Sequence, residues 1–347
     1  MQKKSNDITI EKFEKLKTIQ PWCIDKVFRN DSEIRIKGWS YFSKEDEIKI
    51  KCNNTFPKEY NYRVIRKDLP KIFSFWNDAK LGGFECLYEI GNYEHLEFSK
   101  CTGELTTEYL NNYFYFEDNL PLPQSENMIR VAGSDLVSAF RLEGYSIYKK
   151  IKYVLENKYQ FEFNKSKKIL DWGCGCGRLT RYLVTQESEI WGSDIDQDNL
   201  SWCEQNLKIK PILHEIDNQI SFPKNYFDLI IGISVMTHLQ FELQLKWLVI
   251  LANSLKKGGM LVLSTHGESC ALRSLNDESF KIFQSKGYID LHHNKNMEKY
   301  IKKGYLYRDV FNSIEFINNN WNDNYVISNI FNSVIGNNQD LVFLIKK

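Results

Sequence analysis

Three glycines and an acidic residue stand together in the stretch Asp171–Arg178, whose sequence is Asp-Trp-Gly-Cys-Gly-Cys-Gly-Arg. The residues before it, Lys168–Asp171, have the apolar pattern of a buried strand, and Leu179–Glu187 after it have the pattern of a helix. A glycine-rich turn between a strand and a helix lets a ligand approach the backbone and meet the N-terminus of the helix. We therefore predict that this turn binds a cofactor.

Two kinds of cofactor use such a turn. A dinucleotide-binding turn has the pattern Gly-x-Gly-x-x-Gly, and its third glycine would fall where this chain has Arg178. The carboxylate of Asp171 would repel a pyrophosphate, whereas it suits the ammonium group of a methionine moiety. The turn thus favours an adenosyl amino acid, S-adenosyl-L-methionine, over a dinucleotide. The contacts predicted in the turn are Asp171, Gly173, Cys174, Gly175 and Gly177.

Two further acids stand at the ends of the next predicted strands. Asp194 follows Asp171 by 194 − 171 = 23 positions, and a carboxylate at that edge of a parallel sheet accepts hydrogen bonds from ribose hydroxyls. Asp196 is better placed to cap the helix that begins near Asn199. Asp217 follows the third strand and is predicted to bind the adenine amino group. Further cofactor contacts are predicted at the neighbouring strand ends, at Ile195, Asn218 and Ser234.

Strands and helices alternate after a proline-marked connector at Glu117–Gln124, which predicts a parallel sheet with helices on both faces. The remaining predicted strands of this region are Ile190–Asp194, Ile212–Ile216, Phe227–Ser234 and Met260–Thr265. The remaining predicted helices are Asn199–Lys208, Phe241–Leu255 and Ser134–Leu155, the last as one helix or as two with a break at Gly144. The tail predicts a helix at Ser313–Asn319 and an antiparallel hairpin of Tyr325–Ile335 with Asp340–Lys346 around Gly336-Asn337-Asn338.

From about residue 128 to residue 347 the chain resembles the class I methyltransferases. The similar text comprises Leu170–Gly177, Asp194, Asp217, Phe222-Pro223, Phe227–Ile230 and Leu255–Leu261. The resemblance implies a Rossmann-like, seven-stranded α/β sheet whose terminal hairpin inserts antiparallel. A narrower set is similar to bacterial methyltransferases found with glycosyltransferases: Arg130–Gly133, Ile233–Leu239 and Thr265–Glu268.

Two histidines are the predicted catalytic residues. Methyl transfer from a sulfonium is an in-line displacement in which positioning supplies much of the rate, and an alcohol acceptor also needs a general base. His238 follows the fourth strand and His266 ends the fifth, so both are predicted to face the transferred methyl, with His238 slightly preferred. A hydrogen-bonded structural role is the alternative for each. Arg130 is predicted to bind the cofactor carboxylate or an anionic acceptor, with a surface arginine as the alternative.

The first 118 residues predict an N-terminal antiparallel β module, preceded by a short amphipathic helix with Ile8, Phe13, Leu16 and Ile19 on one side. The predicted strands there include Ile34–Trp39, Ile48–Lys51, Tyr62–Ile65 and Glu85–Ile90. Residues 119–150 are predicted to lead into a methyltransferase domain at 151–347, with a lid-like insertion at 267–312. His292, His293 and Glu298 lie in this insertion; we expect them to be solvated and predict no metal.

Composition limits the partners and the location. The chain has 46 basic and 45 acidic residues and a net charge of +1, so no nucleic-acid partner is expected. No apolar run approaches the roughly 20 residues of a membrane span, and the start is polar. The eight cysteines form no Cys-x-x-Cys pair and are expected to be reduced thiols of a cytoplasmic protein. A homo-oligomer stays open.

The predicted function is O-methylation of a sugar or glycan intermediate. Methylation of a protein or small metabolite is the alternative within the same core. A glycan- or partner-binding protein is the alternative from another class, with Trp39, Tyr41, Phe73, Phe75 and Trp76 as its exposed aromatics, unless these form the core of the β module.

Overall fold

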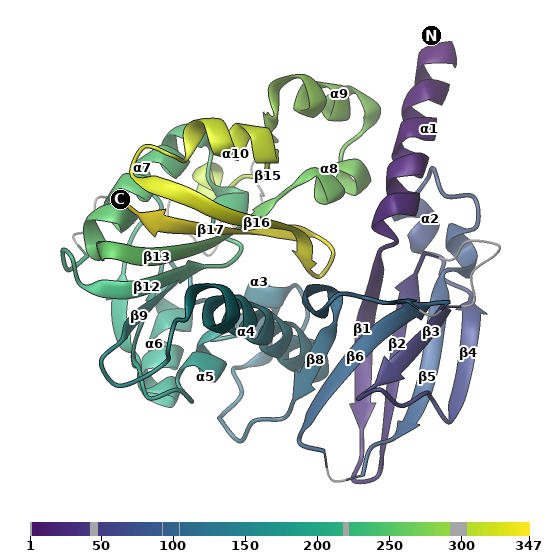
Figure 1. Cartoon of the computed structure of the whole chain (residues 1–347), viewed down its shortest axis with the longest axis horizontal. Coiled ribbons are helices and arrows are strands. Elements are labelled where there is room, and N and C mark those ends of the chain that lie inside the picture. The colour runs from purple at the N-terminus through teal and green to yellow at the C-terminus, as the bar shows by residue number, and fades with distance from the viewer. Residues whose placement is uncertain (1, 42–47, 92, 104, 218–221, 292–303) are drawn as a thin grey trace. The chain divides into compact units, whose positions relative to one another are not determined.

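The computed structural model describes residues 2–41, 48–91, 93–103, 105–217, 222–291 and 304–347. The chain folds into two compact units (Figure 1). The first contains residues 1–118, 136–150 and 272–277, and the second contains residues 119–135, 151–271 and 278–347. Residues 136–150 and 272–277 therefore belong to the first unit, whereas the predicted domain bounds assign them to the connector and to the insertion.

The first unit begins with the predicted amphipathic helix, α1 (Gln2–Ile19). Its buried side is formed by Ile8, Lys12 and Leu16, which recur every four residues. Ile19 is 37% exposed, so its predicted place on that side was wrong. The Lys12 ammonium group instead lies on the buried side and donates to the carbonyl of Leu275 (3.1 Å).

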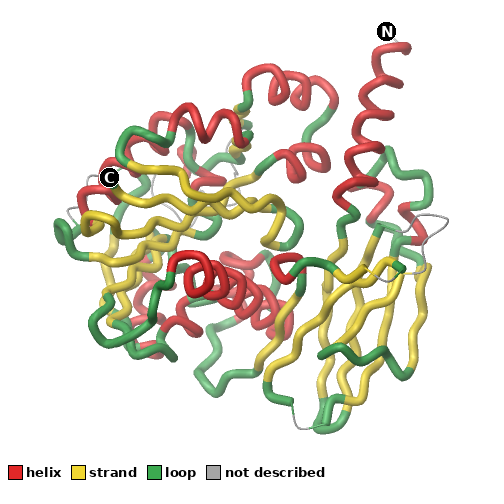
Figure 2. Tube along the Cα trace, viewed as in Figure 1, coloured by secondary structure: helices red, strands yellow, loops and turns green. Residues whose placement is uncertain are grey.

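Two four-stranded antiparallel sheets follow and share one apolar core. One has the order β1 (Trp22–Arg29), β2 (Glu33–Ser40), β5 (Gly83–Glu89), β4 (Glu59–Val64). The other joins β3 (Ile48–Cys52), β6 (His95–Thr102), β7 (Leu105–Thr106) and β8 (Tyr113–Phe116). Figure 2 shows these strands in yellow. The four strands predicted here were present, and β1, β6, β7 and β8 complete the sheets.

The aromatic residues named for the binding alternative are buried. Trp39, Tyr41, Phe73, Phe75 and Trp76 are each 8% exposed or less. The Trp39 and Phe73 rings are 5.1 Å apart, and those of Tyr41 and Trp76 are 5.2 Å apart. Short helices lie among these residues: α2 (Leu69–Ile72), η1 (Ala79–Leu81) and, further on, η2 (Tyr109–Asn111). The predicted alternative of a glycan-binding surface made of these five side chains was therefore wrong, because they are packed in the interior of the first unit.

The second unit is built on a mostly parallel sheet, in which nine strands are described rather than the seven expected. Seven form a row in the order β11 (Lys210–Leu213), β10 (Glu189–Asp194), β9 (Lys168–Trp172), β12 (Phe227–Gly232), β13 (Leu255–His266), β17 (Gln339–Lys346), β16 (Tyr325–Ile335). Strand β17 runs antiparallel to both of its neighbours. The two additional strands, β14 (Tyr288–Asp290) and β15 (Val310–Asn312), come from the insertion and join the row at the end of β13.

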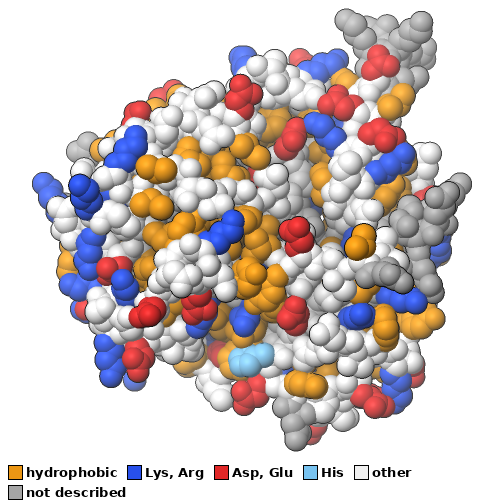
Figure 3. All heavy atoms as spheres, in the orientation of Figure 1, with side chains coloured by type: hydrophobic (Ala, Val, Ile, Leu, Met, Phe, Trp, Pro, Cys, Tyr) orange, Lys and Arg blue, Asp and Glu red, His pale blue; other side chains and the backbone are white. Residues whose placement is uncertain are grey.

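Helices cover both faces of this sheet (Figure 1). On one face α7 (Phe241–Ser254) and α10 (Ile314–Asn320) pack on β12, β13 and β17 through a core that includes Trp172, Trp247 and Trp321. On the other lie α5 (Thr180–Leu183), α6 (Gln197–Leu207) and the end of α4 (Val137–Tyr159). The other helices that enter this unit are α3 (Ser125–Ala132), η3 (Met236–His238), α8 (Glu268–Ser274), α9 (Asp277–Lys286) and η5 (Gly304–Leu306). Apolar side chains gather on the surface over the β16–β17 hairpin (Figure 3).

The structure decides one open expectation about these elements and corrects two. Helix α4 is a single helix without a break at Gly144, because a glycine inside a helix costs only about 1 kcal/mol and keeps its N–H donor. Helix α5 ends at Leu183 because the chain changes to i−3 hydrogen bonds, such as Gln186 N–H to Leu183 O. Strand β11 covers Lys210–Leu213, so the predicted residues 214–216 lie beyond it, although the N–H of His214 still donates to the carbonyl of Asp194 in β10 (3.1 Å).

No helix in the described residues is long and apolar enough to cross a membrane.

Candidate functional site

The glycine turn joins β9 to α5 at the carboxyl edge of the sheet. Its glycines have φ angles of +76° (Gly173), +51° (Gly175) and +81° (Gly177), in the left-handed region that favours glycine. The N–H groups of Gly173 and Cys174 both donate to the carbonyl of Ser193, the penultimate residue of β10 (2.7 and 3.0 Å). A Cβ on Gly175 would lie 2.7 Å from the side chain of Val131 in α3. The turn is therefore held between a strand and a helix, with its backbone closely approached.

Asp171 lies buried beneath this turn, with 2% of its surface exposed. Its Oδ2 atom accepts a hydrogen bond from the hydroxyl of Thr180 at the start of α5 (2.5 Å). Burial raises the pKa of Asp171 to about 7, against the lowering effect of the Thr180 hydrogen bond. A carboxylate so far from water gains much from a cationic partner, and the ammonium group of the predicted cofactor is such a partner.

Asp194 ends β10 and is also buried. Its two carboxylate oxygens accept from the N–H groups of Gly175 (2.7 Å) and Asp196 (2.8 Å). Burial raises the pKa of Asp194 to about 6, and these backbone hydrogen bonds act in the opposite direction. Two N–H donors use only part of the acceptor capacity of a carboxylate, so two ribose hydroxyls fit the remainder. Ile195 follows directly and is half-buried.

Arg130 lies in α3, but the structure pairs it with the start of α6. Asp196 caps α6, as predicted, by accepting from the N–H groups of Asp198 and Asn199. The guanidinium Nε of Arg130 is 3.0 Å from a carboxylate oxygen of Asp196, and its Nη2 is 3.9 Å from Asp198. This ion pair, which the sequence did not indicate, holds α3 against α6. Arg130 thus lies in α3, the helix that contacts the glycine turn through Val131. Its contact with the carboxylate of the cofactor or of an anionic acceptor stays a prediction.

The structure gives the burial and a backbone contact of Asp217, the third predicted acid. Asp217 is half-buried, and its carbonyl accepts from the ammonium group of Lys246 in α7 (2.5 Å). The indole N–H of Trp247 donates to the carbonyl of Ile216 beside it (2.9 Å). Asn218 lies outside the described residues, as do His292, His293 and Glu298.

Both predicted catalytic histidines lie at the carboxyl ends of neighbouring strands, with ring centroids 6.4 Å apart. His238 ends η3, the short helix that comes after β12 in the chain, and His266 ends β13. The Nδ1 atom of His238 is 2.8 Å from the carbonyl oxygen of Arg308 and therefore carries the proton. Burial lowers the pKa of His238, so its ring is neutral at pH 7 and Nε2 keeps a lone pair.

The segment that contains these residues is similar in sequence to a known family. Residues 145–303 match the sequence model of a family described as a methyltransferase domain. This segment of the chain is therefore similar to methyltransferase domains. The matched segment carries the glycine turn, Asp171, Asp194 and both histidines. The protein is accordingly an enzyme, and S-adenosyl-L-methionine is its cofactor.

A comparison with solved structures found methyltransferases of low identity. Similar solved structures include S-adenosylmethionine-dependent methyltransferases from Methanosarcina mazei (17% identity, 55% of this chain and 95% of that chain, TM-score 0.42) and Mesorhizobium loti (12%, 57% and 98%, 0.43). Another is the geranyl diphosphate C-methyltransferase of Streptomyces coelicolor (10%, 61% and 80%, 0.42). Identities this low carry no information on the acceptor of this methyltransferase. No curated relative matches the sequence.

Ser234 follows β12 in the matched segment and has a φ of +61°. Its N–H donates to the hydroxyl of Ser264 (2.7 Å), and its hydroxyl lies 3.0 Å from the amide nitrogen of Gln339, which donates to it. The Ser264 hydroxyl in turn donates to the Gln339 carbonyl oxygen (2.6 Å). Gln339 was missed because nothing near it in sequence marks the first residue of the last strand as part of the site.

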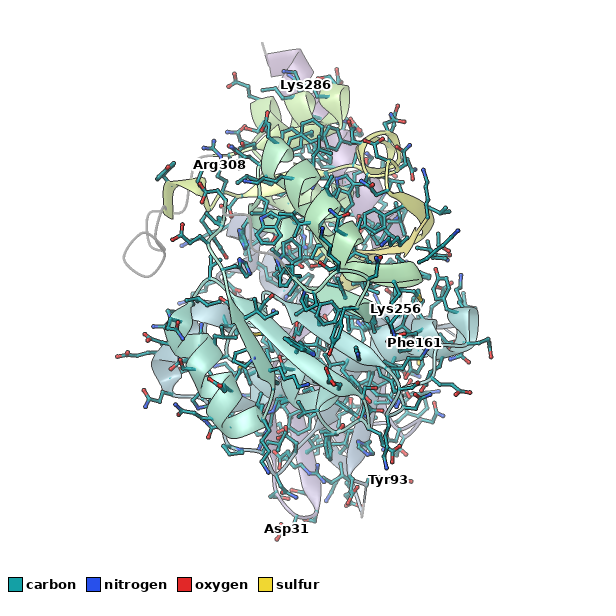
Figure 4. The ribbon with its side chains drawn as sticks, turned by 90° about the vertical axis from the view of Figure 1, so that its left-hand side faces the viewer. Asp31, Tyr93, Phe161, Lys256, Lys286 and Arg308 are labelled. Atoms are coloured by element: carbon teal, nitrogen blue, oxygen red, sulfur yellow. The ribbon has the colours of Figure 1, made fainter. Side chains whose placement is uncertain are left out.

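The segment after η5 was also missed. Tyr307 stacks on the imidazole of His238, with ring centroids 4.0 Å apart and an interplanar angle of 19°. Arg308 forms an ion pair with Asp290, and Asp309 lies 3.8 Å from Nδ1 of His238. In Figure 4 Arg308 lies well away from Lys256, which marks the beginning of β13. Among the described residues, no cluster of three or more His, Cys, Asp or Glu side chains is arranged to hold a metal ion.

Proposed function

We propose that this methyltransferase transfers the methyl group of S-adenosyl-L-methionine to a hydroxyl group of a sugar or glycan intermediate, with His238 as the general base. The observation that carries the proposal is the state of His238. A carbonyl fixes its proton on Nδ1 and burial keeps the ring neutral, so Nε2 is ready to accept a proton at the carboxyl edge of the sheet.

The proposed donor site is formed by the residues around the glycine turn. Asp171 binds the ammonium group, the turn of Gly173, Cys174, Gly175 and Gly177 lies along the methionine moiety, and Asp194 binds the ribose hydroxyls. Asp217 and Asn218 bind the adenine edge, and Ile195 packs on the ring. Ser234 lines the site near the sulfur, and Arg130 is proposed for the carboxylate of the donor or an anionic acceptor.

The bound donor supplies an electrophilic methyl group on a sulfonium. In the transfer, the acceptor oxygen forms a bond to the methyl carbon while the carbon–sulfur bond breaks, which leaves a neutral thioether. The proton of the acceptor hydroxyl moves to Nε2 of His238. His266 lies beside His238 and is proposed to orient the acceptor.

The sugar acceptor is supported by the similarity of Arg130–Gly133, Ile233–Leu239 and Thr265–Glu268 to methyltransferases found with glycosyltransferases. A protein or small-metabolite acceptor would use the same donor site. The binding-protein alternative is disfavoured, since its five aromatic side chains are buried.

The test is transfer of labelled methyl groups from S-adenosyl-L-methionine to a bacterial glycan extract by the full-length chain. We expect label in the carbohydrate fraction and a loss of at least about 100-fold in the H238Q variant, since a general base contributes roughly 10²–10⁴ in rate. S-adenosyl-L-homocysteine should bind H238Q and the wild type equally. Label in protein or small metabolites alone would replace the proposed acceptor, and unchanged activity in H238Q would remove the proposed base.

A further inference from the structure

The segment Gly304–Asn312 is attached to His238 on several sides. The imidazole of His238 donates to the carbonyl of Arg308, and the N–H of Arg308 donates to the carbonyl of His238 (3.1 Å). Strand β15 at the end of this segment pairs with β13 through Phe311 and His266. The Asp290 ion pair fixes the side chain of Arg308. A segment about 70 residues further along the chain thus holds the base by its ring and its backbone.

Tyr307 is the residue of this segment that stacks on the proposed base. One face of its ring covers the imidazole of His238. Burial raises the pKa of Tyr307, the charges of Asp194 and Asp309 raise it further, and the charge of Arg178 lowers it. Asp194 ends β10 and Arg178 follows the glycine turn, so two of these charges come from the proposed donor site. Tyr307 thus stacks on the proposed base and interacts electrostatically with the proposed donor site.

We propose that Tyr307 serves both substrates: its hydroxyl binds the ribose of the adenosyl donor beside Asp194, and its ring positions His238 and shields it from water. This inference rests on the proposed function and adds a residue outside the matched segment 145–303. The carboxylate of Asp194 only accepts hydrogen bonds, and two of its sites are taken by backbone N–H groups. A phenol both donates and accepts, so it binds a hydroxyl that the carboxylate alone leaves half satisfied.

The ring has a separate effect on the base. A flat aromatic face 4.0 Å from the imidazole replaces water on that side. Water stabilises the charged imidazolium, so its exclusion keeps the ring neutral and available to accept a proton. Removal of the ring should therefore raise the pKa of His238, whereas removal of the hydroxyl alone should not.

Two variants of the full-length chain separate these effects. Y307F keeps the ring and removes the hydroxyl, whereas Y307L removes both. The controls are Y305F and Y305L, because Tyr305 lies two residues earlier in the same segment and is 57% exposed. The probe is S-adenosyl-L-homocysteine, titrated by calorimetry, and the His238 pKa is followed by NMR of labelled histidine, with H238Q identifying the resonance.

We expect Y307F to weaken binding of S-adenosyl-L-homocysteine about tenfold, the cost of roughly one hydrogen bond, with the His238 titration unchanged. We expect Y307L to weaken binding at least as much and to move the His238 pKa up toward 6.5. Both Tyr305 variants should match the wild type. Binding by Y307F equal to that of the wild type would overturn the donor contact, and an unchanged His238 titration in Y307L would overturn the positioning role.

Y307F is nearly isosteric and tests the donor contact even if Y307L does not fold. In that case Y307M, which also lacks an aromatic face, provides the ring comparison: a raised His238 pKa supports the positioning role, and an unchanged one opposes it. A wild-type chain that does not bind S-adenosyl-L-homocysteine would contradict the proposed function itself. Wild-type binding with an unaffected Y307F would contradict only this inference.

Discussion

Two buried carboxylates are proposed to meet the donor, Asp171 its ammonium group and Asp194 its ribose hydroxyls. Asp171 and Asp194 are each 8% exposed or less, and burial raises the pKa of Asp171 to about 7 and that of Asp194 to about 6. In the absence of the donor, part of the Asp171 population is therefore protonated at neutral pH. An ammonium group beside Asp171 stabilises its ionised form, so binding must release the proton.

This coupling predicts a pH dependence of donor binding. Because the free protein holds a proton on Asp171 below about pH 7, the affinity for S-adenosyl-L-homocysteine should fall as the pH decreases from 8 to 6 and level off above 8. Calorimetry in buffers of different ionisation enthalpy should show proton release near pH 6.5. D171N should bind roughly 10- to 100-fold more weakly at pH 8 and release fewer protons.

D323N is the matched control, because Asp323 is an exposed acid of the same unit. It should leave both the affinity and the proton release unchanged. An affinity for the wild type that is constant from pH 6 to pH 8 would show that Asp171 does not meet the ammonium group.

At the scale of elements, the local patterns predicted the framework of the second unit well. Strand β16 has the predicted bounds, Tyr325–Ile335, and β9 is one residue longer than predicted. These strands follow from alternation and buried apolar runs, which are local properties. The contacts of Arg130 with Asp196 and of Tyr307 with His238 join residues more than 60 positions apart. No pattern within a window of the sequence contains such pairs, so they were missed.

The contact of α3 with the glycine turn gives a prediction at this scale. An alanine at position 175 would have to adopt a φ of +51°, and its Cβ would lie 2.7 Å from the side chain of Val131. G175A should therefore destabilise the protein by more than the roughly 1–2 kcal/mol of the backbone conformation alone, and it should weaken binding of S-adenosyl-L-homocysteine. In V131A, which removes the overlapping methyl groups, the G175A substitution should cost less.

Urea unfolding of the two single variants and the double variant measures this coupling. G103A is the control for the backbone contribution, since Gly103 has a φ of +59° with no atom within 4 Å of its Cβ position. Its cost should match that of G175A in the V131A background. Strictly additive effects of G175A and V131A would show that α3 does not confine the turn.

At the scale of the whole molecule, the chain passes from one unit to the other at residues 118, 135, 150, 271 and 277. Helix α4 continues without interruption through residue 150. In the first unit, the Ser146 hydroxyl exchanges hydrogen bonds with the N–H (2.8 Å) and carbonyl (3.0 Å) of Phe114. In the second, the Lys152 ammonium donates to Gln186 (3.1 Å). One helix is therefore part of two cores.

This shared helix predicts that the two units unfold together. If either unit melts, half of α4 loses its packing, and a helix of that length is marginal without tertiary contacts. Calorimetry of the full-length chain should show one transition, and S-adenosyl-L-homocysteine at about 100 times its Kd should move the whole transition upward, by roughly 2.7 kcal/mol of added stability. Two transitions in the wild type, with only one shifted, would contradict this coupling.

A proline at Lys149 tests the role of α4 directly. K149P removes a backbone donor inside the helix at a cost of about 3 kcal/mol, next to the boundary at residue 150. We expect its transition to split in two, with S-adenosyl-L-homocysteine raising only the one that belongs to the second unit, which contains the glycine turn and both histidines. K149A removes the same side chain, whose ammonium lies 5.9 Å from the ring of Phe114, but leaves the helix intact. It should therefore keep a single transition, and a split in K149A as well would assign the coupling to that side chain instead of to the continuous helix.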